Sequence, residues 1–356
     1  MIYYKALWGV SMDKLDIFKK YCKEIFLVDS PSGYVELINE KVISLLNKLN
    51  IKANITNKGT IEIFVKGKDS SKKIGVCAHI DTLGLMVRSI NSDGTLNVTN
   101  IGGPLIPTLD GEYCRVRTRD NKVYTGTILS TSPSIHVFPD SKSKPRDIDN
   151  IVVRLDEVVK SKDDVLKLGI NNGDYVCYDT KLEFTESGFM KSRFIDDKGS
   201  VCSLLSVLEL MVNNKVCPKY DTYIYFTNYE EVGTGASSIN SLDELLAVDM
   251  GCVGMDLSGN EMALSICAKD SGGPYNYEFT TRLINLAKDN NIDYVVDIFP
   301  FYGSDAGAAL RSGLDAKAGL IGPGVASSHG MERTHLKAIE ATIDLVSLYL
   351  FGTKLN

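Results

Sequence analysis

FIDDKG, residues 194–199, is the stretch on which the interpretation of this sequence depends. Asp196 and Asp197 lie between an apolar pair and a Lys-Gly, directly before a segment with helical spacing of apolar residues. Neighbouring buried carboxylates repel each other, and both ionise only when a cation lies close by. An Asp pair before a helix is also a common cap. The pair alone therefore leaves a metal site and a helix cap both open.

An α/β pattern lies on both sides of this stretch. Helical spacing occurs at 13–28, 38–49, 199–212, 282–289 and 339–350, and apolar runs typical of strands occur at 61–65, 75–78, 223–226, 246–248, 294–298 and 318–321. A continuous apolar run is typical of a strand that is buried on both faces. Helices combined with such strands predict a three-layer α/β/α sandwich around a central mixed sheet.

The pattern changes after His79 to short β segments separated by turns. Strands are predicted at 85–90, 113–118, 123–129, 151–155 and 174–177, with one short helix from Ser161 to Leu168. A β-rich unit of about 100 residues is large enough to fold independently. We therefore expect a discontinuous catalytic α/β domain at 1–84 and 186–356, and an inserted PDZ-like or barrel domain at 85–185.

Composition excludes several classes of protein. The 356-residue chain is 44% hydrophobic with a net charge of -6, and it lacks the basic character of nucleic-acid binders. No apolar run reaches the roughly 18 residues that span a bilayer. Met1 to Val10 contain one Lys and no cleavage site, so we expect no signal peptide. Eight cysteines without a C-x-x-C pattern are typical of reduced thiols, which indicates a cytoplasmic protein.

A histidine and a carboxylate directly follow the predicted strand at 75–78. Residues i and i+2 of a strand point to the same face, so Asp81 can accept the second ring N–H of His79. Such a contact fixes the tautomer of a metal-binding histidine. A core histidine tied to a local carboxylate is the alternative.

Other candidate ligands also follow predicted strands. Glu230 and Glu231 come after 223–226, Asp249 after 246–248, and His329 in a polar loop after 318–321. Ligands bind at the carboxyl ends of strands in open α/β sheets. Solvated turns, a cap and an exposed loop histidine remain as alternatives for the single residues. Together, the carboxylates and imidazoles are a suitable donor set for a pair of divalent cations with a bridging water.

The remaining histidines carry no expected chemistry. His136 lies in a polar loop of the inserted domain, and His335 is expected to begin or cap the last helix.

Over nearly its whole length the sequence resembles peptidase family M42, the glutamyl, deblocking and tetrahedral aminopeptidases. The resemblance is carried by residues 78–81, 100–104, 168–174, 195–198, 230–233, 247–249, 303–307 and 328–329. The 117 residues from His79 to Asp196 (196 − 79) contain the inserted domain, as in that family. Departures from its pattern flank the site and bear on substrate preference: Thr82, Lys198 and the segment 330–333.

The resemblance implies roles for the site residues. It implies two zinc or cobalt ions, a cis peptide between Asp196 and Asp197, and Asp196 as the ligand shared by both ions. It assigns Glu231 and His329 to one metal, His79 and Asp249 to the other, Glu230 as general base, and Asp81 as the residue that orients His79. Asp305 is a candidate substrate contact.

The resemblance implies a metallo-aminopeptidase that acts on short peptides and assembles into a homo-oligomer, a dodecamer, through the inserted domain. A di-metal amidase or deacylase that acts on N-acyl amino acids or a small modified dipeptide is the nearest alternative. A non-catalytic metal-binding assembly protein belongs to a different class, and an intact Glu230 argues against it. A glycosidase is disfavoured, because metal-ligating carboxylates cannot also flank a sugar.

Overall fold

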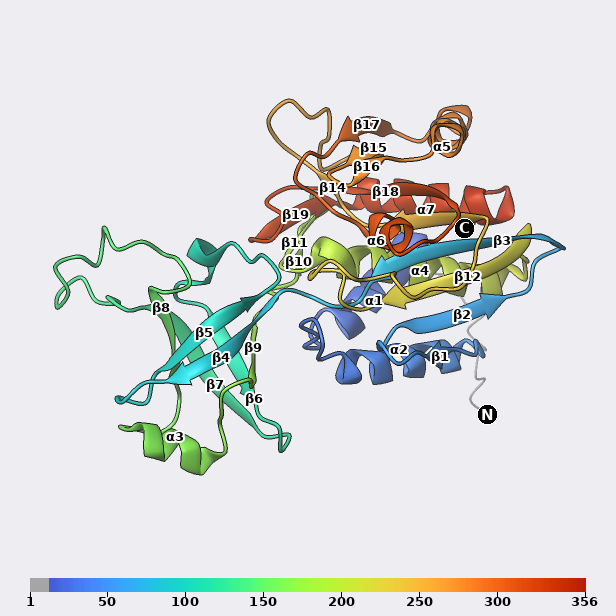
Figure 1. Ribbon diagram of the computed structural model, residues 1–356. Helices are drawn as coiled ribbons and strands as arrows, with labels where there is room; N and C mark the ends of the chain where they lie inside the picture. Colours follow the sequence, from blue (N-terminus) through green and yellow to red (C-terminus); the bar gives the residue numbers. More distant parts are fainter. Residues whose placement is uncertain (1–12) are drawn as a thin grey trace, which may run out of the picture.

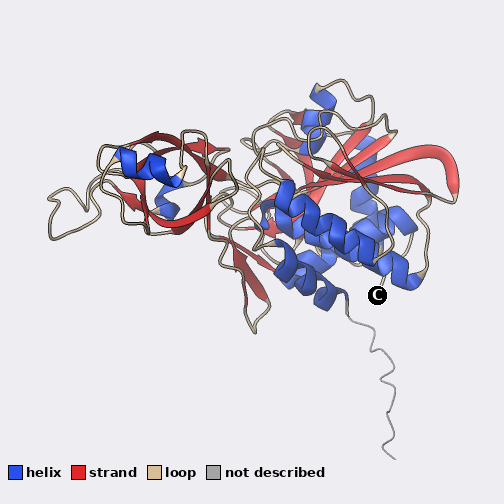
Figure 2. Cartoon of the chain, turned by 90° about the horizontal axis from the view of Figure 1, so that it is seen from below, coloured by secondary structure: helices blue, strands red, loops and turns tan. Residues whose placement is uncertain are grey.

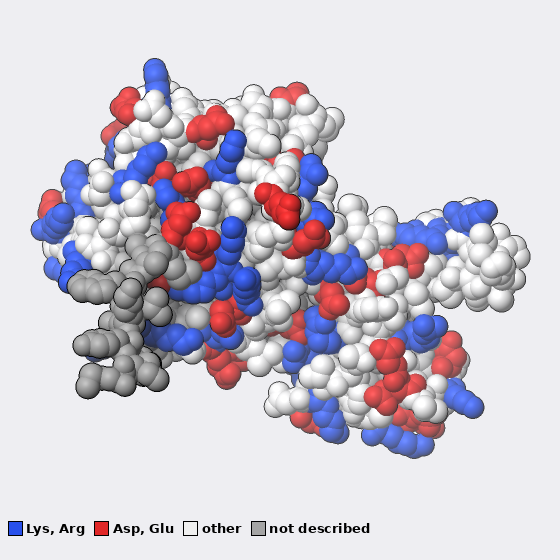
Figure 3. All heavy atoms as spheres, turned by 180° about the vertical axis from the view of Figure 1, so that it is seen from behind, with Lys and Arg blue, Asp and Glu red and all other residues white. Residues whose placement is uncertain are grey.

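A computed structural model describes residues 13–356, so the expectation about Met1 to Val10 lies outside the described residues. The chain forms a sandwich of helices and strands and, beside it, a separate barrel (Figure 1). All eight cysteines are free, and six are buried. Between residues 13 and 356 there is no helix with the length and apolar character needed to cross a bilayer. On the face shown in Figure 3, basic and acidic side chains are interspersed.

The sandwich is built on a ten-stranded mixed sheet with the order β1-β2-β12-β3-β13-β18-β15-β16, in which β14 pairs with β18 and β17 with β15. The strands are β1 Asn54–Ile55, β2 Ile61–Val65, β3 Asp69–His79, β12 Tyr220–Thr227, β13 Glu244–Val248, β14 Gly251–Cys252, β15 Leu264–Asp270, β16 Gly273–Pro274, β17 Tyr294–Ile298 and β18 Lys317–Val325. β12, β3, β13 and β18 are parallel neighbours. Their carboxyl ends therefore meet at one edge of the sheet.

Helices cover both faces of this sheet, as predicted (Figure 2). The helices are α1 Lys14–Ile25, α2 Glu36–Lys48, α4 Ile195–Asn214, α5 Tyr277–Asp289, α6 Asp305–Arg311 and α7 Leu336–Phe351. Val76 and Ala78 of β3 pack into the core shared with α1, α4 and α7, whereas Cys77 packs on the α6 side. This alternation explains the continuous apolar run. His335 caps α7 as expected, because its Nδ1 accepts the Lys337 main-chain N–H at 3.0 Å.

The inserted segment is a closed antiparallel barrel with the order β4-β5-β8-β7-β6-β9. Its elements are β4 Gly84–Ile90, β5 Leu96–Ile101, η1 Ile106–Leu109, β6 Tyr113–Arg117, β7 Val123–Ser130, β8 Ile151–Leu155, α3 Lys162–Leu168 and β9 Tyr175–Tyr178. The barrel has its own apolar core, which includes Val98 and Val153. Ser161 caps α3 as predicted, and His136 is exposed in the loop between β7 and β8.

The sequence interpretation missed several strands, of which β5 and β15, with six and seven residues, are the longest. β5 alternates apolar and polar residues but is only six residues long between two turns, and β15 ends directly before the turn-forming residues Ser271 to Pro274. β5 pairs with the preceding β4 and with the more distant β8, and β15 pairs with β16, β17 and β18.

A small third sheet leads from the barrel back into the sandwich. It has the order β10-β11-β19 and contains β10 Glu183–Phe184, β11 Phe189–Ser192 and β19 Glu332–His335. Ser192 pairs with Glu332, so the residues just before α4 lie beside the segment that follows β18. This sheet brings the FIDDKG stretch next to the loop that contains His329.

Candidate metal centre

The carboxyl ends of the four parallel strands bring the predicted residues together. His79 is the last residue of β3, and it lies opposite Thr227 at the end of β12. The remaining candidates follow the neighbouring strands: Glu230 and Glu231 after β12, Asp249 after β13, and His329 after β18. The sequence separates these residues by up to 250 positions (329 − 79), but the sheet places them around one site.

Asp196 lies between the two imidazoles. It precedes the regular turns of α4, with φ −74° and ψ 102°, and the Asp196–Asp197 peptide is cis, as the family resemblance implied. Its Oδ1 is 3.0 Å from Nε2 of His79, and its Oδ2 is 3.6 Å from Nε2 of His329. The carboxylate of Asp196 therefore presents one oxygen to each histidine.

Main-chain carbonyls orient both imidazoles. Nδ1 of His79 donates to the main-chain oxygen of Asp81 at 2.9 Å, and Nδ1 of His329 donates to the main-chain oxygen of Gly103 at 2.9 Å. A carbonyl only accepts, so each Nδ1 carries a proton. In the neutral ring, each Nε2 then directs its lone pair at the carboxylates, which is the tautomer that binds a metal.

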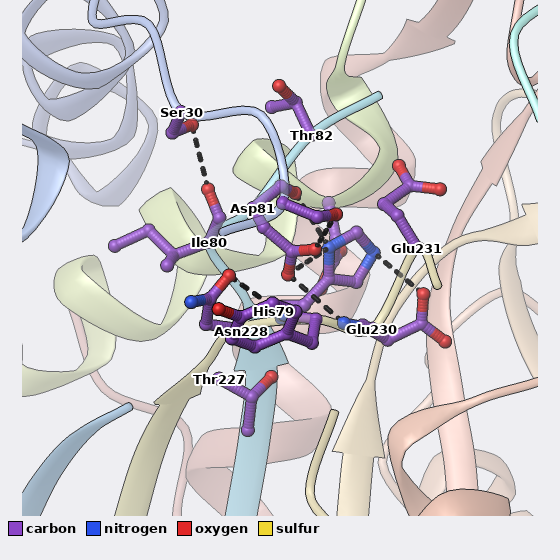
Figure 4. Close-up of polar contacts among 12 residues, drawn as sticks. Ser30, His79, Ile80, Asp81, Thr82, Thr227, Asn228, Glu230 and Glu231 are labelled. Atoms are coloured by element: carbon purple, nitrogen blue, oxygen red, sulfur yellow. Dashed lines mark hydrogen bonds and ion pairs between the residues drawn. The ribbon is translucent and has the colours of Figure 1, made fainter. Parts of the chain in front are cut away.

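The contact made by Asp81 differs from the predicted one. Its carboxylate was expected to accept the His79 proton, but that oxygen is 3.7 Å from Nδ1. β3 ends at His79, so the alternation of a strand does not extend to Asp81. The Asp81 carboxylate instead accepts from the Ser32 hydroxyl. It also accepts the Glu230 main-chain N–H at 3.2 Å (Figure 4).

Glu230 and Glu231 both reach the site, because the chain turns directly after β12. Oε2 of Glu230 is 3.7 Å from Nε2 of His79, and Oε2 of Glu231 is 3.6 Å from Nε2 of His329. Oε1 of Glu231 is buried without a hydrogen-bond partner. Both residues line a polar pocket of about 220 Å³ together with Asp196 and Asp249.

Crowding of the carboxyl groups is the main electrostatic feature of the site. Burial, and then the charges of neighbouring carboxylates, raise the pKa values of Asp197, Glu230 and Glu231 well above their usual range. The same two causes raise the pKa of Asp249 to about 7. Burial acts on Asp196 in the same direction, but the hydrogen bond and positive charge of the doubly protonated form of His79 hold the pKa of Asp196 below its usual value. Carboxylates this close ionise together only when positive charge is added.

The donor set fits divalent cations. Two groups of three residues have ligand atoms within 4.8 Å of one another: His79, Asp197 and Asp249, and His79, Asp196 and Glu231. The buried oxygens without partners, Oε1 of Glu231 and Oδ1 of Asp197, are atoms that a cation would satisfy. Imidazole with carboxylate is a donor set suited to zinc and similar ions.

Glu332 is a site residue that the sequence interpretation did not assign. Its Oε2 accepts the main-chain N–H of Asp196 at 3.0 Å, and its Oε1 accepts the main-chain N–H of His329 at 3.0 Å. The side chain is buried, with a relative exposure of 2%. One carboxylate thus connects the two segments that lie on either side of the centre. The only sequence signal is its spacing, three residues after a loop histidine.

Asp305 lies beneath the loop that carries the two glutamates. One oxygen accepts from the Thr227 hydroxyl, and the other accepts the Ala236 main-chain N–H at 2.7 Å. Both oxygens are therefore engaged by protein groups, and Asp305 is absent from the residues that line the polar pocket. Asp305 therefore supports this loop through its hydrogen bonds to Thr227 and Ala236.

An α/β/α sandwich with imidazoles and carboxylates at the strand ends of its mixed sheet is typical of metal-dependent hydrolases. The sequence model of the family described as M42 glutamyl aminopeptidase matches residues 59–345. The chain therefore belongs to the M42 peptidase family and is an aminopeptidase of this family.

Relatives and solved structures agree with this assignment. The chain is 41% identical over 330 residues to the YhfE protein of Bacillus subtilis (strain 168), covering 92% of this chain and 95% of that one. It is 26% identical over 218 residues to the lysyl aminopeptidase of Pyrococcus furiosus, covering 60% of each.

Two archaeal structures share the fold. An aminopeptidase from Desulfurococcus kamchatkensis has a TM-score of 0.83 at 24% identity, covering 96% of each chain. The Pyrococcus horikoshii TET1 peptidase has a TM-score of 0.83 at 21% identity, covering 94% of this chain and 99% of that one. At these identities, the likeness shows the architecture of sandwich plus barrel.

Proposed function

We propose that this chain is a two-metal aminopeptidase that removes N-terminal residues from short peptides. The observation that carries the proposal is the position of Asp196, whose two oxygens face the two imidazoles. A carboxylate so placed is suited to bridge two cations. The lysyl aminopeptidase among the relatives supports a peptide with a free N-terminus as substrate.

The proposed ligands are those that the family resemblance implies, and the contacts around Asp196 support them. Asp196 is shared, Glu231 and His329 complete one site, and His79 and Asp249 complete the other, with zinc or cobalt as the ions. Bound divalent cations would lower the pKa of a water molecule and polarise the scissile carbonyl. Asp197, whose carboxylate accepts the His79 main-chain N–H at 3.0 Å, holds the end of β3 against α4.

Glu230 is the proposed general base. Its side chain is 13% exposed and lines the polar pocket, so a substrate and a water molecule can reach it. Glu230 accepts a proton from the water whose oxygen attacks the carbonyl carbon, and it then gives this proton to the amine nitrogen as the C–N bond breaks. Asp81 positions both His79 and Glu230. Its main-chain oxygen accepts from the ring of His79, and its carboxylate accepts the main-chain N–H of Glu230.

The test compares Glu230→Gln with its neighbour Glu231→Gln. We expect Glu230→Gln to retain its metal-to-protein ratio while kcat on amino-acid p-nitroanilides falls by about 10²–10⁴, the usual contribution of a general base. Glu231→Gln should lose metal as well as activity. Metal analysis and steady-state kinetics measure both. Undiminished turnover by Glu230→Gln would contradict the assignment, and faster hydrolysis of N-acyl amino acids than of anilides would favour a deacylase.

We also propose that the protein is a homo-oligomer, a dodecamer, in which the barrel domain at 85–185 mediates assembly and 1–84 with 186–356 form the catalytic domain. The separate core of the barrel supports such a division. The Pyrococcus horikoshii TET1 peptidase, whose architecture this chain shares, assembles into a tetrahedron or an octahedral shell. Sedimentation equilibrium tests the proposal, and a species of 39.1 kDa alone would contradict it.

A further inference from the structure

A second, apolar pocket opens onto the same centre. It has a volume of about 500 Å³ and is lined by segments within 103–105, 250–257 and 299–302, together with Ser328 and His329. Tyr302 and His329 line both this pocket and the polar pocket that contains Glu230 and Asp196. A molecule bound at the metal centre therefore has two directions in which to extend.

The lining of the second pocket is suited to a large apolar group. Leu105, Met255 and Phe301 have relative exposures of 51%, 102% and 99%, so large apolar side chains stand free at its walls. Clustered exposed apolar residues mark binding surfaces. Asp256 is the one acidic residue in the lining, and the lining contains no Lys or Arg. A substrate carboxylate placed here would have no positive partner, which disfavours its burial.

The polar pocket is suited to the other part of a peptide. Arg311, the last residue of α6, lines it and makes no ion pair with any carboxylate of residues 13–356. A guanidinium without a protein partner is suited to a carboxylate such as the C-terminus of a short peptide. The leaving peptide would therefore lie in the polar pocket, and the side chain of the N-terminal residue would lie in the apolar pocket.

We propose that the apolar pocket, which we name the Met255 pocket, binds the side chain of the substrate's N-terminal residue and selects large apolar residues such as Leu, Met and Phe. The inference rests on the proposed aminopeptidase function and specifies its substrate class. Each methylene missing from a hydrophobic pocket lowers kcat/KM about tenfold or more. Substrates that begin with Ala or Glu should therefore be poor.

The experiment measures kcat/KM of the metal-loaded full chain on the p-nitroanilides of Leu, Met, Phe, Ala, Glu and Lys. We expect the values for Leu, Met and Phe to exceed those for Ala, Glu and Lys at least about tenfold. Met255→Arg should lower the ratio of Leu to Glu about tenfold, because it adds a cation and removes apolar surface. Tyr277→Arg, at a residue of α5 that is 86% exposed and lies outside both pockets, is the matched control and should leave this ratio unchanged.

Other outcomes overturn the inference. A wild-type preference for Glu or Lys would do so, as would an unchanged ratio in Met255→Arg. If a second copy of the chain covers the pocket, Met255→Arg changes the sedimentation mass and leaves the ratio unchanged, which also overturns it.

A failure of the aminopeptidase function itself gives a different result, since no anilide is then hydrolysed. Calorimetric binding of L-phenylalanine and L-glutamate to the metal-loaded protein tests the pocket independently. Tighter binding of L-phenylalanine supports the pocket assignment, and equal or tighter binding of L-glutamate refutes it.

Discussion

The two imidazoles face the carboxylates because their Nδ1 atoms donate to main-chain oxygens. One of these oxygens belongs to Gly103, in the segment that joins β5 to η1, and the Leu105 main-chain N–H in turn donates to the oxygen of His329 at 3.0 Å. His329 is thus held by its ring and by its main chain. Its φ of 64° lies in the left-handed region, so these contacts maintain an uncommon backbone conformation.

Glu332 completes this support, and its removal should weaken metal binding. In Glu332→Gln, the amide keeps one acceptor oxygen but turns an NH₂ group toward a main-chain N–H of Asp196 or His329. Loss of such a supporting contact typically lowers metal affinity about 10- to 100-fold. Equilibrium dialysis with Co²⁺ and the visible spectrum of the cobalt-loaded protein measure the change.

Glu186→Gln, at an exposed turn, is the matched control for Glu332→Gln and should bind Co²⁺ as the wild type does. Equal affinities for all three proteins would show that Glu332 does not position the ligands.

At the scale of elements, the position of Asp249 depends on how closely β18 approaches the end of β13. The Asp249 main-chain N–H donates to the oxygen of Ile321 at 2.9 Å. A Cβ at Gly322, the next residue of β18, would lie 1.4 Å from the main-chain oxygen of Asp249. Only glycine permits this approach of two main chains. The proposed ligand Asp249 is therefore positioned by a residue that has no side chain.

Gly322→Ala should displace Asp249 from the metal centre. We expect a loss of roughly 1–3 kcal/mol in the free energy of unfolding, as for other overpacked sites, together with reduced metal content. Gly319→Ala in the same strand is the control, because its Cβ would meet only side chains of Leu283 and Phe279 at 3.2 Å. Urea unfolding and metal analysis compare the two variants. Equal effects would contradict the role assigned to the close approach.

At the scale of the whole molecule, an ion cluster connects the sandwich to the barrel. Asp29, which follows α1, accepts from Nη2 of Arg115 at 2.8 Å and from Nε of Arg117 at 2.7 Å, both on β6. Burial alone would raise the pKa of the Asp29 carboxyl, but the hydrogen bonds and charges of Arg115 and Arg117 hold it below its usual value of 3.8. The cluster therefore stabilises the folded state through an ionised Asp29.

This pKa shift makes the contribution of Asp29 dependent on pH. Since the folded-state pKa is lower than that of the unfolded chain, the stabilisation is present above about pH 4 and is lost as the pH falls through the folded-state pKa. Asp29→Asn should lower the free energy of unfolding by roughly 1–3 kcal/mol at neutral pH, as expected for a charged hydrogen bond. The difference from wild type should narrow between about pH 5 and 3.

Urea unfolding at several pH values measures this difference. Asp120→Asn, at an exposed ion pair within the barrel, is the control and should change the stability little. A difference between Asp29→Asn and wild type that stays constant down to pH 3 would contradict the linkage.

The sequence alone determined the sandwich, the insertion and the residue types of the centre. A buried strand and the polar residue that follows it are neighbours in the chain, so His79, Glu230 and Asp249 could be assigned to strand ends from local pattern. Parallel strands share an edge, and this rule brings such residues together. The Asp196–Asp197 pair could likewise be placed at a helix start.

Only the tertiary structure decided how these residues are held. The Gly103 oxygen that orients His329 lies 226 residues away in the chain, and no local pattern reports that contact. The same holds for the two main-chain N–H groups bound by Glu332. It also holds for the Ala236 main-chain N–H, which Asp305 accepts beneath the loop that carries Glu230 and Glu231. Hydrophobic periodicity is set by neighbouring residues, whereas these contacts depend on the packing of distant segments.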